Sequence, residues 1–156
     1  MSRVLVAVWN HVFSIESFGE PVDQGGAYIG GLVRPRGTRL DIFTNRYAGP
    51  VPVAFEFLDA DTRDAVDDWE DVCEASMDVS QGALTLSSFD DSWALPKMAP
   101  TLGSTRVRIH ARGRGIREEW DEVLDDVTEE YLLQMWPAPP APPEILLQST
   151  DPGGAS

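Results

Sequence analysis

The feature that most constrains the fold of this chain is a period-two alternation of apolar and polar residues. Residues 104–112 show it most clearly, because Val107, Ile109 and Ala111 fall on one face of an extended strand. The other face carries four basic side chains, which are Arg106, Arg108, His110 and Arg112. Successive side chains of a β-strand point to opposite faces of its sheet. Because such alternation recurs along the chain and helical stripes are scarce, the sequence predicts an all-β protein.

Turn residues divide the chain into short strands. Residues 34–37 carry a Pro-x-Gly turn signal and predict a hairpin over residues 32–44. A second hairpin is predicted over residues 72–88, with Ser80-Gln81-Gly82 as its turn. About seven to nine strands of this kind, with turns between them, predict an antiparallel β-sandwich.

Two strands carry further constraints. Residues 4–9 are apolar throughout, which favours a strand covered on both faces. Pro50 and Pro52 lie at the start of a strand over residues 51–58, and proline suits an edge strand or the first residues of a strand because it lacks an N–H. The predicted core of the sandwich contains Val6, Val8, Phe55, Phe57, Leu84, Leu86, Val107, Ile109, Leu132 and Leu133.

The chain is expected to form one β-sandwich domain over residues 1–136, followed by a Pro-rich extended tail over residues 137–156. The proline run that opens the tail favours a polyproline II arm, and residues 145–147 are expected to dock back on the domain. Helix is an alternative at residues 62–73 and 116–127, where apolar side chains share one helical face. An irregular loop explains both stretches equally well.

Charge limits the classes of partner. The chain has 26 acidic and 12 basic residues, a formal net charge of -14, and most carboxylates lie in residues 59–78 and 118–130. A surface of this sign favours a basic protein partner and disfavours nucleic acid. A local basic stripe is expected to pair with the acidic blocks on neighbouring strands, and it consists of Arg106, Arg108, Arg112, Arg114 and Arg117.

The sequence also predicts a cytoplasmic protein without a membrane partner. No apolar run approaches the roughly 20 residues that span a bilayer. The first ten residues have one basic residue and no small-residue cleavage site, so they favour a strand over a secretory signal. A single cysteine, Cys73, cannot form an internal disulfide, which is consistent with a reducing compartment.

No catalytic, cofactor or metal site is predicted. His11 is expected to be a hydrogen-bonded structural residue, His110 a plain surface histidine and Cys73 a buried inert thiol. The acidic runs break the spacing of a calcium loop, and the paired glycines at 25–26 and 30–31 precede no helix that could bind phosphate. We therefore expect no enzyme, although a carboxylate pair across a cleft would escape such a search.

Four segments resemble segments of a known protein family. They are residues 9–13, with Trp9 and Phe13, the Gly-Gly-Ala-Tyr stretch at 25–28, residues 102–107, and the strand at 131–135. Their order over about residues 4–136 resembles the competence protein J group. That resemblance implies a small acidic β-sandwich that inhibits a nuclease. The chain departs from the group in its proline tail and in its second acidic block. Residues 131–139 (YLLQMWPAP) also resemble the ending of actinobacterial-type proteins from high-GC genomes.

The leading functional hypothesis is an interaction protein that binds a basic nuclease or toxin. The candidate contact residues surround a tryptophan in each acidic block, and they are Asp67, Asp68, Trp69, Glu70 and Asp71, then Glu118, Glu119, Trp120, Asp121 and Glu122. Each tryptophan is either an interface anchor or a satellite of the core. The alternatives are an enzyme of another class and a carbohydrate- or peptide-binding sandwich that uses Trp9, Trp93 or Trp136 as a stacking platform.

Overall fold

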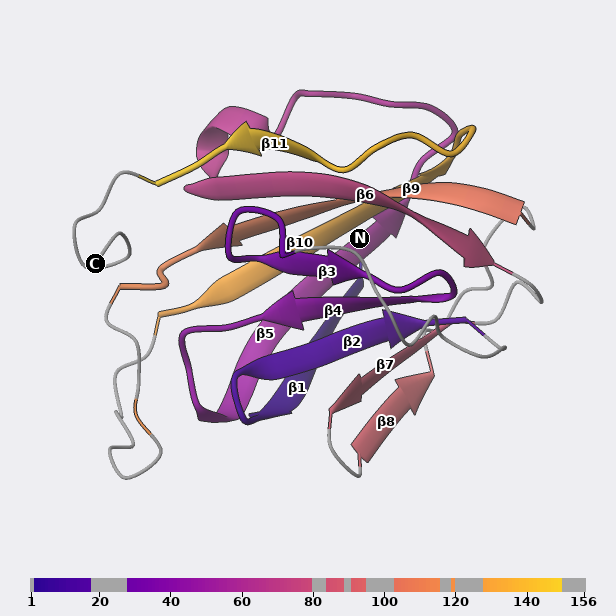
Figure 1. Cartoon of the computed structure of the whole chain (residues 1–156). Helices are drawn as coiled ribbons and strands as arrows, with labels where there is room; N and C mark the ends of the chain where they lie inside the picture. Colours follow the sequence, from indigo (N-terminus) through magenta and orange to yellow (C-terminus); the bar gives the residue numbers. More distant parts are fainter. Residues whose placement is uncertain are drawn as a thin grey trace.

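The computed structural model describes residues 2–17, 28–79, 84–88, 91–94, 103–115, 119 and 128–149, and it shows an all-β protein (Figure 1). The strands are β1 (Ser2–Trp9), β2 (Val12–Glu16), β3 (Val33–Pro35), β4 (Arg39–Phe43), β5 (Ala48–Phe57), β6 (Asp71–Val79), β7 (Thr85–Ser88), β8 (Asp91–Ala94), β9 (Gly103–Arg112), β10 (Glu130–Pro137) and β11 (Glu144–Leu147). The helical content of these ranges is one 3-10 turn, η1, at Val66–Asp68. Within them, no helical segment has the length and hydropathy of a membrane span.

All strands belong to one sheet, whose order is β11-β6-β9-β10-β5-β1-β2-β4-β3, with β7 paired to β2 and β8. The sheet bends sharply between β1 and β2, which pair only through Trp9 and Val12. Beyond this corner the sheet folds back, so that β3 and β4 pack on β6 while β7 packs on β1. In Figure 1 the strands β2, β3 and β4 accordingly lie in front of β1 and β5. The result is a curled half-barrel.

The prediction of an all-β protein is therefore correct, whereas the predicted antiparallel sandwich of seven to nine strands is wrong in its arrangement and in its number of strands, which is eleven in the described residues. β10 pairs with β5 in the parallel direction, from Tyr131 opposite Val53 to Met135 opposite Phe57, so the sheet is mixed. β5 and β10 are separated by a long stretch of chain, and only strands joined by a short turn must run antiparallel. Alternation along each strand carries no information about this direction.

The core lies between the two halves of the curled sheet. One rung of inner-face side chains shows its make-up, because Cys73 of β6, Ile109 of β9 and Leu133 of β10 lie side by side and are all at most 1% exposed. The predicted core residues that join this cluster are Val6, Val8, Phe55, Leu84, Leu86, Val107, Ile109 and Leu133. Phe57 is only partly buried against it. Leu132 is buried on the opposite face, since neighbouring residues of a strand point in opposite directions.

The first predicted hairpin is confirmed and the second is wrong. β3 and β4 pair antiparallel with Val33 opposite Ile42. β6 instead pairs with β9 and β11, while β7 pairs with β2 and β8. Both edges of β6 are therefore occupied, by β11 and β9, which leaves no edge on which β7 could form a hairpin with it. The predicted turn at residues 80–82 lies outside the described residues.

β1 and β5 also depart from expectation. β1 is covered on one face only, since Val6 and Val8 are buried whereas Leu5 is 63% and Trp9 46% exposed. β5 is an interior strand between β1 and β10 rather than an edge strand. Its prolines are nevertheless tolerated, because β10 pairs with β5 only from Val53 onward. The first half of β5 is thus a local edge, where a missing N–H leaves no ladder bond unmade.

Two segments cross the outer face of the sheet, away from the core. Residues 58–70, the covering segment, contain η1 and lead into β6, so no α-helix forms over residues 62–73. Residues 138–149, the C-terminal arm, leave β10 and return as β11, which pairs antiparallel with β6 and sets Ile145 opposite Cys73. The expected docking of residues 145–147 is therefore confirmed. The possible helix at 116–127 lies outside the described residues.

Replacement of Ile109 by alanine tests this fold. Ile109 is fully buried at the centre of the inner face, so the variant should lose on the order of 2–5 kcal/mol of unfolding free energy in denaturant titration. Leu5→Ala is the matched control, because Leu5 is 63% exposed and its truncation should be nearly neutral. Equal losses for the two variants would contradict the assignment of the two faces.

Candidate protein-binding surface

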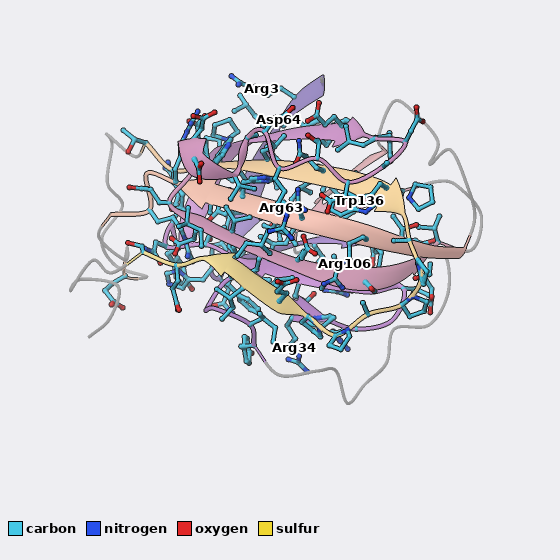
Figure 2. All side chains as sticks on the ribbon, turned by 90° about the horizontal axis from the view of Figure 1, so that it is seen from above. Arg3, Arg34, Arg63, Asp64, Arg106 and Trp136 are labelled. Atoms are coloured by element: carbon cyan, nitrogen blue, oxygen red, sulfur yellow. The ribbon has the colours of Figure 1, made fainter. Side chains whose placement is uncertain are left out.

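The outer face of β9 carries the basic side chains predicted for it, but they do not lie in solvent. Arg106 is 5% exposed, and Arg108 and His110 are fully buried. The prediction of a surface His110 is therefore wrong, because the covering segment and the C-terminal arm overlie this face. Figure 2 looks onto it and shows Arg63 and Asp64 of the covering segment above the sheet.

Glu74 of β6 binds both buried arginines. Its Oε2 accepts a hydrogen bond from Arg108 Nε at 2.9 Å, and its Oε1 accepts one from Arg106 Nε at 3.1 Å. The Arg108 guanidinium also donates to Asp61 Oδ1 at 2.5 Å and to the carbonyl of Thr62, and it lies 4.7 Å from the Trp136 ring centroid. Buried charges require such complete pairing to offset their desolvation.

Arg106 extends the same network to the C-terminal arm. Its two terminal nitrogens donate to the carbonyls of Ala141 at 3.0 Å and Pro142 at 2.9 Å. Figure 2 shows the chain after Trp136 curving round to reach β11. These carbonyls accept well because a proline-rich segment has few intramolecular partners of its own.

The predicted pairing of the basic stripe with the acidic blocks is confirmed for its described members. Arg106 and Arg108 pair with Glu74, Arg112 Nε lies 2.5 Å from Glu130, and Arg114 lies 3.7 Å from Asp71. Arg117 lies outside the described residues. The stripe thus closes internal ion pairs and is not an open basic surface.

Trp69 fixes the end of the covering segment. Its half-buried ring lies 4.1 Å from the Arg112 guanidinium carbon and 5.7 Å from the His110 ring centroid. The neighbouring backbone is held as well, since the Asp68 carbonyl accepts from Arg112 at 2.9 Å and Glu70 Oε1 accepts from the Gly113 N–H at 2.6 Å. Trp69 therefore packs on the outer face of the sheet and lies outside the hydrophobic core cluster, and its role as an interface anchor stays a prediction.

This anchoring presents a row of exposed carboxylates. The covering segment exposes Asp59, Asp61, Asp64, Asp67, Asp68 and Glu70, with Arg63 as its one exposed base. Of the five predicted contact residues in this block, Asp67, Asp68 and Glu70 are exposed and Trp69 is half-buried. Asp71 is buried, because it accepts the Ser149 N–H at 2.7 Å and faces Arg114.

A shallow groove of about 390 Å³ adjoins these carboxylates. Its floor includes Ala54 and Leu132, which pair across β5 and β10 on the outer face. Trp69 forms part of one wall. The charged residues on its lining are Arg3, Asp68, Arg112 and Glu130. The groove therefore combines an apolar floor with a charged rim next to the acidic row.

The second acidic block is described only in part. Glu118, Trp120, Asp121 and Glu122 lie outside the described residues, and Glu119 is exposed. Glu129 has a structural role that alternation did not reveal. Its carboxylate accepts the N–H groups of Asn45 and Arg46 at 2.9 Å each and the hydroxyl of Tyr131.

Three further titratable groups, His11, Cys73 and Tyr131, are buried. His11 Nδ1 lies 3.1 Å from the carbonyl of Thr44, as expected of a structural histidine. Cys73 is 1% exposed, which confirms its predicted burial, and this burial, reinforced by Asp71, raises the pKa of the thiol to about 12. Burial raises the pKa of Tyr131 as well, with Glu129 as the second cause. In the part of the chain that the structure describes, no group of acidic, His or Cys side chains is arranged to hold a metal ion.

The pH dependence of stability tests the closure of the outer face. Burial, and secondarily the charge of Arg108, lowers the pKa of His110 from its ordinary value of 6.5 to about 4. A lowered pKa means that the neutral form is favoured in the folded state, so this contribution is complete above pH 6.5 and is lost as the pH falls toward 4. Between pH 7 and 4, wild type should lose on the order of 3 kcal/mol more than a His110→Gln variant. Identical pH profiles in denaturant titrations would contradict a buried neutral imidazole.

The comparisons with known proteins concern the fold. No protein-family model matches the chain, and no curated protein matches it. The solved structure of ComJ from Bacillus subtilis, inhibitor of the DNA-degrading activity of NucA, matches with a TM-score of 0.61 at 10% identity, covering 88% of this chain and 96% of ComJ. The structure of the crocagin biosynthetic gene J product matches with a TM-score of 0.51 at 9% identity and the same coverages. The chain therefore has a ComJ-like fold, as the order of its sequence segments predicted.

Proposed function

We propose that this chain is an inhibitor-like protein that binds a basic nuclease through the carboxylates of its covering segment. The observation that carries the proposal is the exposure of Asp67, Asp68 and Glu70 beside Trp69, whose ring packs on Arg112, while Glu70 Oε1 accepts the Gly113 N–H. A nuclease site must be positively charged to hold phosphate. Ordered carboxylates complement such a site without the entropic cost of ordering a free loop.

Net charge supports the same proposal. At a formal charge of -14, the chain attracts a basic protein over a distance and repels nucleic acid. Arg106, Arg108, Arg112 and Arg114 form ion pairs with Glu74, Glu130 and Asp71, so these bases do not present a separate positive patch to a partner. Among the described residues, the covering segment carries six exposed acids, more than any other segment, and these acids are a local source of this attraction. We propose the second acidic block as an additional contact for a partner in the cytoplasm, through Glu118, Glu119, Trp120, Asp121 and Glu122.

The ComJ-like fold raises the expectation of an inhibitor, since ComJ inhibits the DNA-degrading activity of NucA. The same fold occurs in the product of a crocagin biosynthetic gene, so the fold alone does not assign a function. The support specific to this chain comes from its covering segment. A basic nuclease is therefore proposed as a class of partner, and its identity is left to experiment.

The stacking-platform alternative has less support. Trp136 is 5% exposed and lies against Arg108, so it offers no open ring face to a sugar. The side chain of Trp93 lies outside the described residues. Trp9 is 46% exposed and packs edge-on against Tyr47 at 5.4 Å. A sugar-binding platform would thus depend on Trp9 alone among the described tryptophans named for it.

Charge reversal tests the proposed contact. We expect Asp67→Lys with Asp68→Lys to slow association with a basic nuclease about tenfold or more at low salt, and to relieve inhibition of DNA degradation. Suitable probes are purified NucA and the basic nuclease encoded nearest to this chain in its own genome. Stopped-flow association and a DNA-degradation assay provide the readouts.

The matched control changes net charge equally at another place. Asp78→Lys with Glu144→Lys alters two exposed carboxylates on β6 and β11, away from the covering segment. Its effect should be the smaller one and should vanish at about 0.5 M salt, where charges are screened within a few ångströms. If both double variants slow association equally, the acidity is a general solubility feature and the covering segment is not the contact.

Removal of the Trp69 ring tests the anchoring. Trp69→Ala deletes the contacts with Arg112 and His110, so the covering segment should exchange its amide hydrogens faster while the core strands keep their protection. Dissociation from a bound nuclease should accelerate, because the carboxylates must then be ordered on binding. Trp69→Phe retains a ring over Arg112 and is the conservative control. Unchanged exchange in residues 58–70 of Trp69→Ala would refute the anchoring role.

A further inference from the structure

We infer that the nuclease partner packs apolar side chains against the outer face of β1 and the first half of β5. This apolar stripe consists of Leu5, Ala7, Trp9, Pro50 and Pro52. The inference rests on the proposed function and deepens it, because it assigns to the partner a second contact of different chemistry. The partner is a basic protein that presents aliphatic or aromatic side chains beside its lysines and arginines.

The register of the strands makes the stripe continuous. Leu5 lies opposite Pro52, and Ala7 lies opposite Pro50, with Trp9 following at the end of β1. These β1 residues share one face because they alternate with Val6 and Val8, which enter the core. Neither the covering segment nor the C-terminal arm closes this end of the outer face, since Leu5, Ala7 and Pro50 are exposed.

Two large apolar side chains of the stripe, Leu5 and Trp9, are exposed to solvent. Leu5 is 63% and Trp9 46% exposed, and both project from one strand of regular structure. Contiguous exposed apolar side chains on a soluble domain mark interaction surfaces more often than single ones do. The two prolines add rigidity, so little conformational entropy is lost when a partner covers them.

Charge identifies the class of occupant. A second copy of this chain would bring another formal charge of -14 to the contact, so self-association through the stripe is opposed by repulsion. A basic partner is instead attracted by the net negative charge of this chain. A partner bound on the stripe can also contact the exposed acids of the covering segment, because Pro52 lines the same groove as Asp68 and Trp69.

The two contacts affect different rate constants of binding. Exposed carboxylates act over a distance and raise the association rate, whereas apolar burial acts only after contact and lowers the dissociation rate. Arg3 lies next to Leu5 on the same face of β1 and lines the groove between the two regions. Charge reversal of Arg3 should speed association with a basic partner. Of the two described basic residues that line the groove, Arg112 pairs with Glu130, whereas reversal of Arg3 breaks no ion pair of this kind.

Truncation of the stripe is the first test. Leu5→Ala and Trp9→Ala should each accelerate dissociation from NucA, or from the basic nuclease encoded nearest to this chain, by about tenfold or more. The acceleration should persist at about 0.5 M salt, unlike the effect of Asp67→Lys with Asp68→Lys. Ile145→Ala and Tyr28→Ala are matched controls, because these large apolar side chains are 46% and 59% exposed elsewhere on the molecule. Dissociation rates that are equal for stripe and control variants would overturn the inference.

A fluorescent label at Ala7 is the second test and does not depend on truncation. Ala7→Cys provides a uniquely reactive thiol, since the native Cys73 is 1% exposed. A bimane label there should shift to shorter wavelength when the nuclease binds, while the same label at Glu144→Cys on β11 should not. A complex that forms without a shift at Ala7 overturns the stripe and leaves the proposed function intact. Absence of a complex with either nuclease overturns both.

Discussion

Much of this structure depends on one buried carboxylate, Glu74, which pairs with both Arg106 and Arg108 on the outer face of the sheet. Neither guanidinium would be stable there alone, because a buried charge without a partner costs several kcal/mol. Each arginine uses its remaining donors to hold a different segment. Arg108 binds Asp61 and Thr62 of the covering segment, and Arg106 binds the carbonyls of residues 141 and 142. One ion-pair cluster thereby fixes both segments that close this face.

That closure determines which surface remains available. Most of the outer face of β6, β9 and β10 is covered, and the cover itself presents carboxylates outward. The outer face of β1 and the first half of β5 stays open and apolar. Acidic and apolar regions meet at the groove beside Trp69 and Pro52. An interface with charged and apolar parts side by side combines rapid encounter with slow release.

The arginine stripe shows how easily a local pattern can mislead about function. In isolation, residues 106–114 have the composition of a nucleic-acid contact. In the fold they neutralise Glu74, Asp61, Glu130 and Asp71, and Arg112 supports Trp69. These arginines therefore form intramolecular ion pairs, and the exposed charges of the covering segment are mostly acidic. His110 follows the same logic, since an outward position on a strand became a buried one when a second layer covered it.

Local patterns in the sequence were enough to predict the all-β class, the hairpin of β3 and β4, the inward face of β9 and the buried Cys73, because alternation and turn chemistry are local properties. The sequence also predicted the acidity and the pairing of the arginines, because charged side chains on a covered face need partners of opposite sign. Only the tertiary structure decided the parallel pairing of β5 with β10, the corner between β1 and β2, and the separation of β6 from β7. Only the tertiary structure, too, covered His110 and left Leu5 and Trp9 in solvent. The physical reason is that alternation states which side chains share a face, whereas the layer that covers each face comes from residues distant in the chain.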